Sequence, residues 1–525
     1  MPVLLDGGCF IGQAMGGASP CTPDDLLRSL DEHGVSTALV GSYRSLYHDV
    51  KAGNREAAQF ASKHPERIIP LGILHPARYD ESPAQQLAWL KQDLGISIAA
   101  LFSLPSYYPI VWDSPWMVEL GRAADDLGVV LQAGIRDDVE LAAVGRAWGG
   151  LKTPVLVRWM AGHRYRMHGH EQAAARAWPN FFFDVGNACS TGAITRLVET
   201  IGADRLFFAS NTPHNLPASP HAVFAEAKLS PLDRAWIASG TLQTVLSTTT
   251  KESPTTASGQ AHRKLWAKLK AWPKFDTHWH PDHWNLGEPA TDFAAQQRTW
   301  TEFGVERVLA FSIEAINYDL DAGNRQTERV LAADPRAVGL IVVNPLQPRE
   351  SLAQIERLAA HPRFVGVKTI QDNYGLGLDH AAYEPLLAEA AKRDLPVLAH
   401  LTGMEGAARK FPTVRFVGAH GNWGRTHRLR ALPNVWFDFS TSHALAEETQ
   451  LARFIRETGP QRILFGSDGQ LVSPAWSLAK LMDCGLSDEE LDLILRRNAE
   501  QVFPKAKAGH QRTQGIADWR PESRS

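Results

Sequence analysis

The sequence predicts an α/β protein built from two tandem (β/α)8 TIM barrels. Three observations support this prediction. The chain of 525 residues is too long for one ordinary core. Its two halves carry the same short motifs in the same order. In each half, strand-like apolar runs alternate with stretches rich in Ala, Leu and Glu that are typical of helices.

The repeat is visible in motifs whose spacing drifts slowly while their order never changes. This pattern indicates a duplication followed by small loop insertions. The clearest motif pairs are Leu5–Phe10 with Phe275–His280, Asp126–Gln132 with Asp394–His400, Pro179–Asp184 with Pro433–Asp438, and Asp204–Asn211 with Gln461–Asp468.

The boundary between the halves is predicted from composition. Ser247–Gln260 is rich in Ser and Thr and nearly free of large apolar residues, which is typical of a linker, and a short basic helix is expected at Ala261–Ala271. The predicted organisation is a first barrel at 1–246, the linker and helix at 247–271, a second barrel at 272–505 and a flexible tail at 506–525.

The second half shows the alternation most clearly. Helical stretches such as Tyr383–Arg393 and Asp488–Arg497 separate its strand-like runs. A doubly wound sheet is the alternative, but closure into a barrel better explains how polar residues from runs one, five, six and eight would meet. The runs lie near 275–280, 306–313, 337–343, 364–369, 396–400, 414–419, 435–439 and 462–466.

Composition excludes several classes of protein. Hydrophobic residues make up 44% and charged residues 21%, and the net charge of −3 gives no case for a nucleic-acid or membrane partner. The N-terminal residues lack the basic and apolar regions of a signal peptide, and no apolar run is long enough to span a membrane. The four cysteines show no CxxC spacing. We therefore expect a cytoplasmic protein.

Several runs of the second half end in a histidine or an aspartate. His278 and His280 follow the first run, His400 and His420 follow later runs, and Asp468 follows the last. Residues two apart on a strand share a face, so His278 and His280 can act together. Imidazoles and a carboxylate at the C-terminal ends of barrel strands are typical of a divalent metal site.

With these residues in view, the second half resembles the amidohydrolase superfamily, in particular its aminocarboxymuconate-semialdehyde decarboxylase branch, often labelled amidohydrolase-2. The similarity extends over about 270 to 505 and depends on the motifs as a set. They are Asp276–Pro281, Gly366–Lys368, Leu395–His400, Gly418–Gly421 and Arg462–Asp468.

The resemblance implies one divalent ion, zinc by preference with manganese or iron as alternatives, bound by His278, His280, His400 and Asp468. It also implies a catalytic role for His420 beside the metal. Asp468 or His420 would accept the proton of a metal-activated water. The alternatives are a structural histidine pair and a His420 that supports a loop.

Other residues are candidates for substrate binding. Lys368 could bind a substrate carboxylate, form a salt bridge within the barrel mouth, or be carbamylated to bridge two metals. Arg425 could meet an anionic substrate or lie on a solvated loop. Trp279 and Trp423 could wall an aromatic substrate, with ordinary packing as the alternative.

By the same alignment, the first half lacks the metal ligands of the second half. Gly8, Phe10, Gln132 and Asn211 stand where the four metal ligands stand in the second half. None of these residues is a good zinc ligand, so we expect a degenerate, pseudoenzyme-like barrel without metal.

One loop of the first half remains a candidate for function. Pairing Arg158-Trp159 with Arg415-Phe416 makes His163 the candidate match for His420. The basic and aromatic loop His163–His170 could reach the second site as a partner subunit does in this branch, or it could be a solvated rim. Intramolecular pairing of the two barrels and formation of a homo-oligomer are both compatible with the resemblance.

Two enzymatic functions fit these residues. The first is a metal-dependent hydrolase of a small carboxylated or cyclic amide or ester. The alternative is a metal-dependent non-oxidative decarboxylase of an aromatic or unsaturated carboxylic acid. A non-catalytic binding protein is a third hypothesis, and the complete set of ligands in the second half argues against it.

Overall fold

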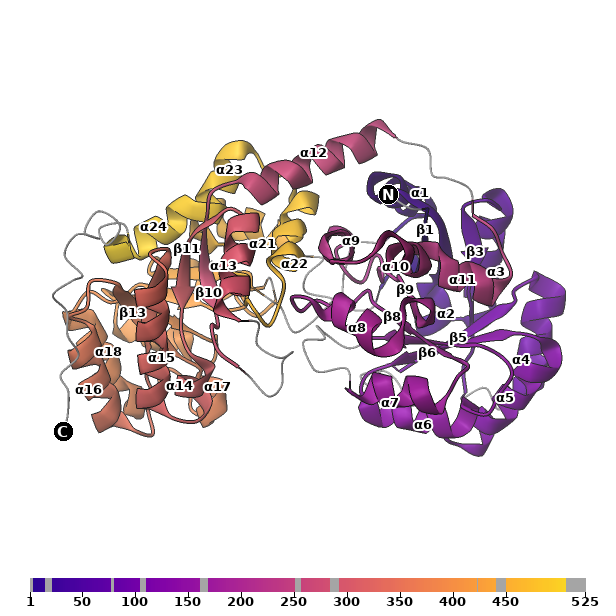
Figure 1. Cartoon of the computed structure of the whole chain (residues 1–525), viewed down its shortest axis with the longest axis horizontal. Helices are drawn as coiled ribbons and strands as arrows, with labels where there is room; N and C mark the ends of the chain where they lie inside the picture. Colours follow the sequence, from indigo (N-terminus) through magenta and orange to yellow (C-terminus); the bar gives the residue numbers. More distant parts are fainter. Residues whose placement is uncertain are drawn as a thin grey trace. The chain divides into compact units, whose positions relative to one another are not determined.

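The structure is a computed structural model that describes residues 3–14, 21–76, 80–103, 110–160, 169–250, 256–283, 292–422, 424–440 and 450–506. The described chain forms two compact units, one up to Trp266 and the other from Ala267 onward (Figure 1). The predicted boundaries at 246, 271 and 505 remain predictions.

The second unit contains a parallel sheet of eight strands that follow one another in chain order. The sheet is nearly closed, because the Thr277 N–H donates to the Phe465 carbonyl at 3.0 Å and Trp279 forms a parallel bridge with Gly469. The barrel predicted for the second half is therefore confirmed. Its strands are β10 (Lys274–Trp279), β11 (Val305–Ala310), β12 (Ala337–Val342), β13 (Phe364–Thr369), β14 (Val397–Ala399), β15 (Phe416–Gly418), β16 (Val435–Asp438) and β17 (Ile463–Leu464).

Helices separate these strands, as the sequence pattern requires. The longest, α15, begins after Asp319, whose carboxylate caps the Ala322 N–H, and its inward face carries Leu320, Val330 and Leu331. The helices are α13 (Phe293–Glu302), α14 (Ile313–Asn317), α15 (Leu320–Ala333), α16 (Pro348–Leu358), α17 (Gln371–Tyr374), α18 (Glu384–Lys392), α19 (Met404–Lys410), α21 (Leu451–Thr458), α22 (Pro474–Ala479), α23 (Asp488–Asp492) and α24 (Asn498–Val502).

The first unit holds two parallel sheets, one of three strands and one of six. A second complete barrel is therefore not confirmed. The break falls between β3 and β4, where Pro70 has no N–H to donate and Leu71 belongs to neither strand. The strands are β1 (Leu4–Ile11), β2 (Val35–Ser42), β3 (Ile68–Pro70), β4 (Gly72–Ile73), β5 (Ile98–Phe102), β6 (Val130–Ile135), β7 (Val155–Trp159), β8 (Phe181–Asp184) and β9 (Leu206–Phe207).

Helices also alternate with the strands of the first unit. At α1, Thr22 and Asp25 form a capping box, and Gly34 closes the helix in the left-handed region at φ 69°. The helices are α1 (Pro23–His33), α2 (Tyr43–Tyr47), α3 (Val50–Lys63), α4 (Pro83–Ala88), α5 (Pro115–Leu127), α6 (Asp138–Trp148), α7 (Gly169–Ala177), α8 (Ala193–Ile201), α9 (Ala218–Glu226), α10 (Pro231–Ala235) and α11 (Thr241–Leu246).

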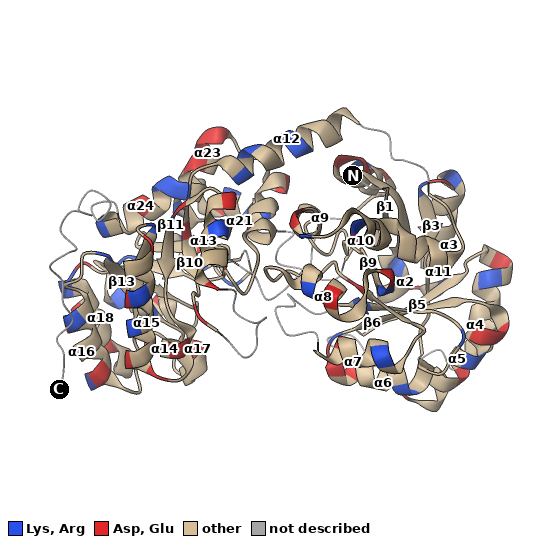
Figure 2. Cartoon of the chain, in the orientation of Figure 1, with Lys and Arg blue, Asp and Glu red and all other residues tan. Residues whose placement is uncertain are grey.

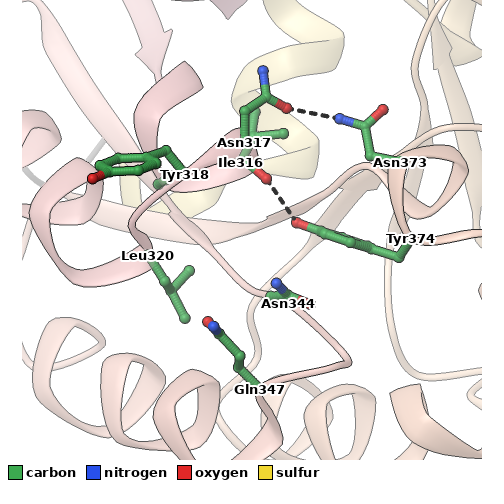
Figure 3. Close-up of a pocket in the computed structure, with 9 residues that line it drawn as sticks. Ile316, Asn317, Tyr318, Leu320, Asn344, Gln347, Asn373 and Tyr374 are labelled. Carbon is green, nitrogen blue, oxygen red and sulfur yellow. Dashed lines mark hydrogen bonds between the residues drawn. The ribbon is translucent and has the colours of Figure 1, made fainter.

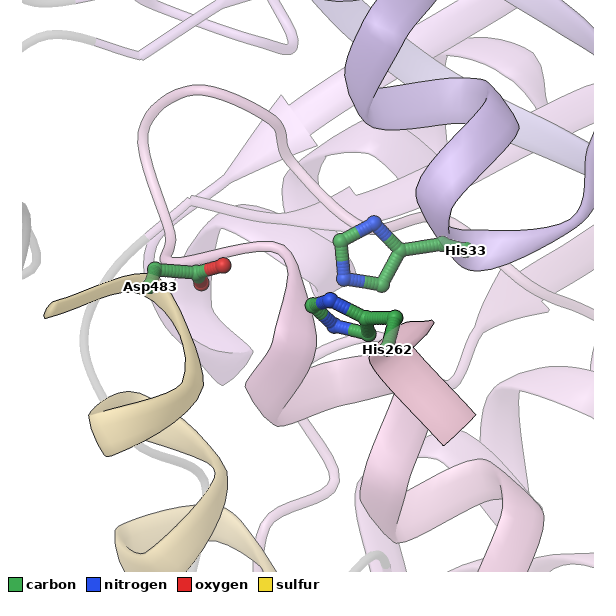
Figure 4. Close-up of side chains that lie close together, drawn as sticks. All are labelled: His33, His262 and Asp483. Atoms are coloured by element: carbon green, nitrogen blue, oxygen red, sulfur yellow. The ribbon is translucent and has the colours of Figure 1, made fainter. Parts of the chain in front are cut away.

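The helix α12 (Ala257–Ala271) includes the helix predicted before the second barrel. Its N-terminal part packs on the first unit, where the indole N–H of Trp266 donates to Glu226 at 3.1 Å. The ring of His262 lies edge-on to that of His33, with centroids 4.5 Å apart (Figure 4), and His33 stacks on His221 at 4.6 Å. Burial lowers the pKa of His33 to about 3, so this cluster is neutral at neutral pH.

Charges of both signs are interspersed over the helices of the two units (Figure 2). This distribution agrees with the near-balance of 54 basic and 57 acidic residues. Within the described ranges, no helix has both the length and the apolar character that a membrane span requires.

Candidate metal centre

The strand β10 sets the position of two imidazoles at the C-terminal end of the barrel. His278 and His280 alternate with Trp279, so both rings lie on the inner face of the strand. Asp276 anchors this end, because one of its carboxylate oxygens accepts the His278 N–H at 3.1 Å and the Ser467 N–H at 2.9 Å. The last strand and the first are thereby held together beside the site.

The two imidazoles converge on Asp468, which follows β17. The distance to Asp468 Oδ1 is 3.6 Å from His278 Nε2 and 3.2 Å from His280 Nε2. All three side chains are buried, and ligand atoms of the three lie within 4.8 Å of one another. Asp468 has a φ of 62° and His420 a φ of 55°, a left-handed conformation that is uncommon for residues other than glycine.

Burial and charge set the protonation states of these groups. Burial, assisted by the Lys368 ammonium, lowers the pKa of His278 to about 4. Burial also lowers the pKa of His420 well below its usual value. For Asp468, burial acts in the opposite direction, but the facing imidazoles still hold its pKa well below the ordinary range. At neutral pH His278 and His420 are therefore neutral and Asp468 is ionised, as metal ligation requires.

A buried carboxylate that was not among the predicted site residues lies behind His278. Asp438, at the end of β16, has its Oδ2 3.1 Å from His278 Nδ1. Its Oδ1 accepts the backbone N–H groups of His420 at 3.1 Å and Ser440 at 3.0 Å. The Ser440 hydroxyl also contacts Asp438 and lies 2.9 Å from His420 Nδ1. Asp438 therefore orients both histidines.

His400 lies at the edge of this cluster. Its ring is 5.1 Å from that of His420, and its Nδ1 lies 2.8 Å from Oδ2 of Asp372 in α17. The hydrogen bond from His400 lowers the pKa of Asp372 to about 2. The structure thus gathers three of the four predicted ligands into one group and places His400 beside His420, so ligation by His400 remains a prediction.

Lys368 lies on the inner face of β13 and is fully buried. Its Nζ is 4.7 Å from the centroid of the Phe311 ring, and it has no hydrogen-bond partner among the described residues. Burial lowers the pKa of Lys368 to about 7, although Asp438 and Asp468 act in the opposite direction. Of the three predicted roles, the salt bridge within the barrel mouth is the one this geometry does not provide.

Trp279 lies in the ordinary packing that was the alternative to a substrate wall. Its indole N–H donates to Gln296 of α13 at 3.0 Å, and its ring packs edge-on against Trp300 at 5.4 Å. Since neighbouring residues of a strand point to opposite faces, Trp279 faces the helix layer while His278 and His280 face the interior. Trp423 lies outside the described residues, as do residues 163–168 of the basic loop.

Arg425 lines a surface hollow of about 460 Å³, most of whose lining residues belong to the segments that follow β14 and β15. Arg409 and Arg428 line the same hollow, together with the acidic Asp379 and Glu405. Arg425 also contributes to the low pKa of Asp372, which places its charge near the partner of His400. A role in binding an anionic substrate remains a prediction.

A second hollow, of about 430 Å³, lies among the loops after β11, β12 and β13 (Figure 3). These loops are at the same end of the barrel as the histidines. Asn373 donates to Asn317 at 2.9 Å across it, and the Tyr374 hydroxyl donates to the Ile316 carbonyl at 3.3 Å. Asn344 and Gln347 add two further carboxamides, so the lining is polar and uncharged.

Comparison with known proteins gives a family and several solved structures. A family model described as Amidohydrolase matches residues 261–505. The crystal structure of 2,6-dihydroxybenzoate decarboxylase from Rhizobium is 14% identical, with 44% of this chain and 98% of that chain covered and a TM-score of 0.37.

Two further structures are similar over comparable lengths. The manganese-containing 5-carboxyvanillate decarboxylase from Novosphingobium aromaticivorans is 16% identical, with 40% of this chain and 79% of that chain covered and a TM-score of 0.34. A candidate 2-pyrone-4,6-dicarboxylic acid hydrolase from Pseudomonas putida is 16% identical, with 44% and 98% covered and a TM-score of 0.35. No curated protein matches the sequence.

Proposed function

We propose that the second unit, whose residues 261–505 match a family model described as Amidohydrolase, is a metal-dependent hydrolase of a small carboxylated or cyclic amide or ester. One observation carries this proposal. The Nε2 atoms of His278 and His280 converge on the Asp468 carboxylate in a buried site at the C-terminal ends of the barrel strands.

The donor set fits a single divalent cation. Two imidazoles and a carboxylate are ligands that zinc accepts readily, and manganese or iron are the alternatives. His400 would complete the set from the edge of the cluster. When bound, such an ion supplies Lewis acidity toward a carbonyl oxygen and lowers the pKa of a coordinated water.

The side chains around the donor set would move the proton and bind the substrate. The ionised Asp468 faces the cluster and can accept a proton there. The neutral His420, held at Nδ1 by Ser440, can accept or donate a proton. Lys368 is buried with a pKa of about 7, and a substrate carboxylate beside it would favour the ammonium form and accept a charge-assisted hydrogen bond from it.

The alternative function is non-oxidative decarboxylation of an aromatic or unsaturated carboxylic acid. The same Lys368 favours it, because a buried cation beside the donor set can hold the carboxylate that is to be lost. The two reactions differ in where the carboxylate lies. In hydrolysis the carboxylate only helps to bind the substrate and lies away from the bond that is cleaved. In decarboxylation the carboxylate is the reacting group.

The experiment is a product-resolved screen of the purified full chain. Cyclic amides, cyclic esters and aromatic carboxylic acids would be supplied separately, with carbon dioxide and ring-opened acids measured in each reaction. Hydrolysis lost in a His278→Ala/His280→Ala variant and kept in the matched control His48→Ala, an exposed histidine of the first unit, would support the main proposal. Carbon dioxide release with the same dependence would establish the alternative, and neither product from any substrate would count against both.

A further inference from the structure

An arginine occupies the interior of the first unit. Arg158, on β7, is fully buried, and its guanidinium donates to Gln132 Oε1 at 3.2 Å and to the Gly8 carbonyl at 3.3 Å. A third contact joins it to the side-chain oxygen of Asn211. Burial lowers the pKa of Arg158, but the carboxylates of Asp184 and Asp6 act against this, so the group stays charged.

The surroundings of this guanidinium match those of the candidate metal centre. One carboxylate oxygen of Asp6 accepts the Gly8 N–H at 3.0 Å and the Ser210 N–H at 2.9 Å. In the second unit the corresponding three residues make the same contacts at 3.1 and 2.9 Å. They are Asp276, His278 and Ser467.

The next residue extends the match. Asn211 follows Ser210 with a φ of 61°, and Asp468 follows Ser467 with a φ of 62°. Gly8 and Asn211 therefore take the places that His278 and Asp468 take in the second unit. The guanidinium of Arg158 contacts the residues at both of these places.

The volume at Gly8 is filled by the arginine itself. A Cβ atom at position 8 would lie 2.0 Å from Arg158 Cζ and 2.1 Å from one of its terminal nitrogens. A side chain at position 8 would require the guanidinium to leave its present place. The glycine at position 8 therefore leaves the space that the guanidinium occupies.

We propose that the guanidinium of Arg158 is the built-in cation of the first unit, standing where the second unit takes a divalent ion. The comparison with an ion rests on the proposed function, whereas the cation site itself rests on the contacts of Arg158. The site favours a planar cation, because Gln132, Gly8 and Asn211 accept from its flat fork and the rings of Phe10 and Phe102 lie 5.8 and 5.5 Å from its Cζ.

Chemical rescue tests this proposal with the full chain. Arg158→Ala removes the cation and leaves buried acceptors without a donor, so we expect a fall in Tm on the order of 10 °C. Guanidinium chloride at about 10 mM, far below denaturing concentrations, should raise the Tm of this variant by several degrees. Sodium chloride at equal ionic strength should not do so. The control is Arg122→Ala, an exposed arginine of α5.

Two results would overturn the proposal: a Tm for Arg158→Ala equal to that of Arg122→Ala, or equal rescue by sodium chloride and guanidinium. If Arg158→Ala yields no folded protein, Arg158→Lys keeps the charge but loses the planar fork. It must then melt below Arg122→Lys, and equal melting temperatures would overturn the proposal. These readouts involve neither catalysis nor metal, so they are independent of the proposed function.

Discussion

Asp438→Asn tests whether the carboxylate behind His278 controls metal affinity. Asp438 is fully buried, and its Oδ2 lies 3.1 Å from His278 Nδ1 while its Oδ1 accepts two backbone N–H groups. An amide of the same shape keeps an acceptor for those N–H groups but removes the charge that orients the His278 ring and makes it more basic. Loss of such a partner typically weakens metal binding by about 10- to 100-fold, or about 1.4 to 2.7 kcal/mol.

Protonation of His278 does not complicate this prediction. Asp438 raises the pKa of His278, which burial has already lowered to about 4. Removing the carboxylate lowers that pKa further, so the imidazole stays neutral at pH 7 in the variant. The expected loss therefore comes from the orientation and basicity of the His278 imidazole.

The assay is competition with a chromogenic chelator for Zn²⁺ and Mn²⁺ at fixed ionic strength. Asp24→Asn, an exposed aspartate of α1, is the matched control and should bind metal like the unmodified chain. An affinity of Asp438→Asn within about twofold of the unmodified chain would refute the role assigned to Asp438, because the typical effect is at least fivefold larger.

Three further predictions follow from the described contacts. Lys368→Met should raise KM for a carboxylated substrate by about 10-fold or more, the value of one charge-assisted hydrogen bond, and an unchanged KM would contradict carboxylate binding by Lys368. Trp279→Ala should destabilise the chain by about 3 to 5 kcal/mol in urea unfolding, with KM unaffected in the fraction that folds; a large rise in KM would restore the substrate-wall role. Because the pKa of His33 falls from 6.5 to about 3 on folding, its stabilising contribution is complete above pH 6.5 and is lost as pH falls toward 3. Urea unfolding at pH 7 and pH 4.5 should show a smaller loss for His33→Leu than for the unmodified chain.

The barrel of the second unit could be predicted because its strands are continuous apolar runs separated by helical stretches. The first unit carries the same pattern, but its third strand is divided into β3, which pairs with β2, and β4, which pairs with β5, and the pattern does not show such a break. His278, His280 and Asp468 were predictable because a short motif places each at a strand end. For Trp279, strand alternation favours packing over a substrate wall, because it directs the side chain away from its two histidine neighbours.

Asp438 and Asp372 could not be identified as site residues from local motifs. Asp438 ends a strand-like run, a visible signal, but its contact with His278 spans 160 residues of sequence. Sequence similarity makes Arg158 the equivalent of Arg415. The strand hydrogen bonds instead make Val155 the equivalent of Phe416, because the Val155 N–H donates to the Asn180 carbonyl and the Phe416 N–H donates to the Asn434 carbonyl. Strand register, which the sequence does not specify at this point, decides which side chain enters the interior.

The most direct test of the central claim is elemental metal analysis of the purified chain beside the His278→Ala/His280→Ala variant. We predict about one divalent ion per chain, held by the second unit and lost in the variant. An ion that persists in the variant, or no ion in the unmodified chain after purification with zinc or manganese present, would contradict the assignment of His278, His280 and Asp468 as a metal centre.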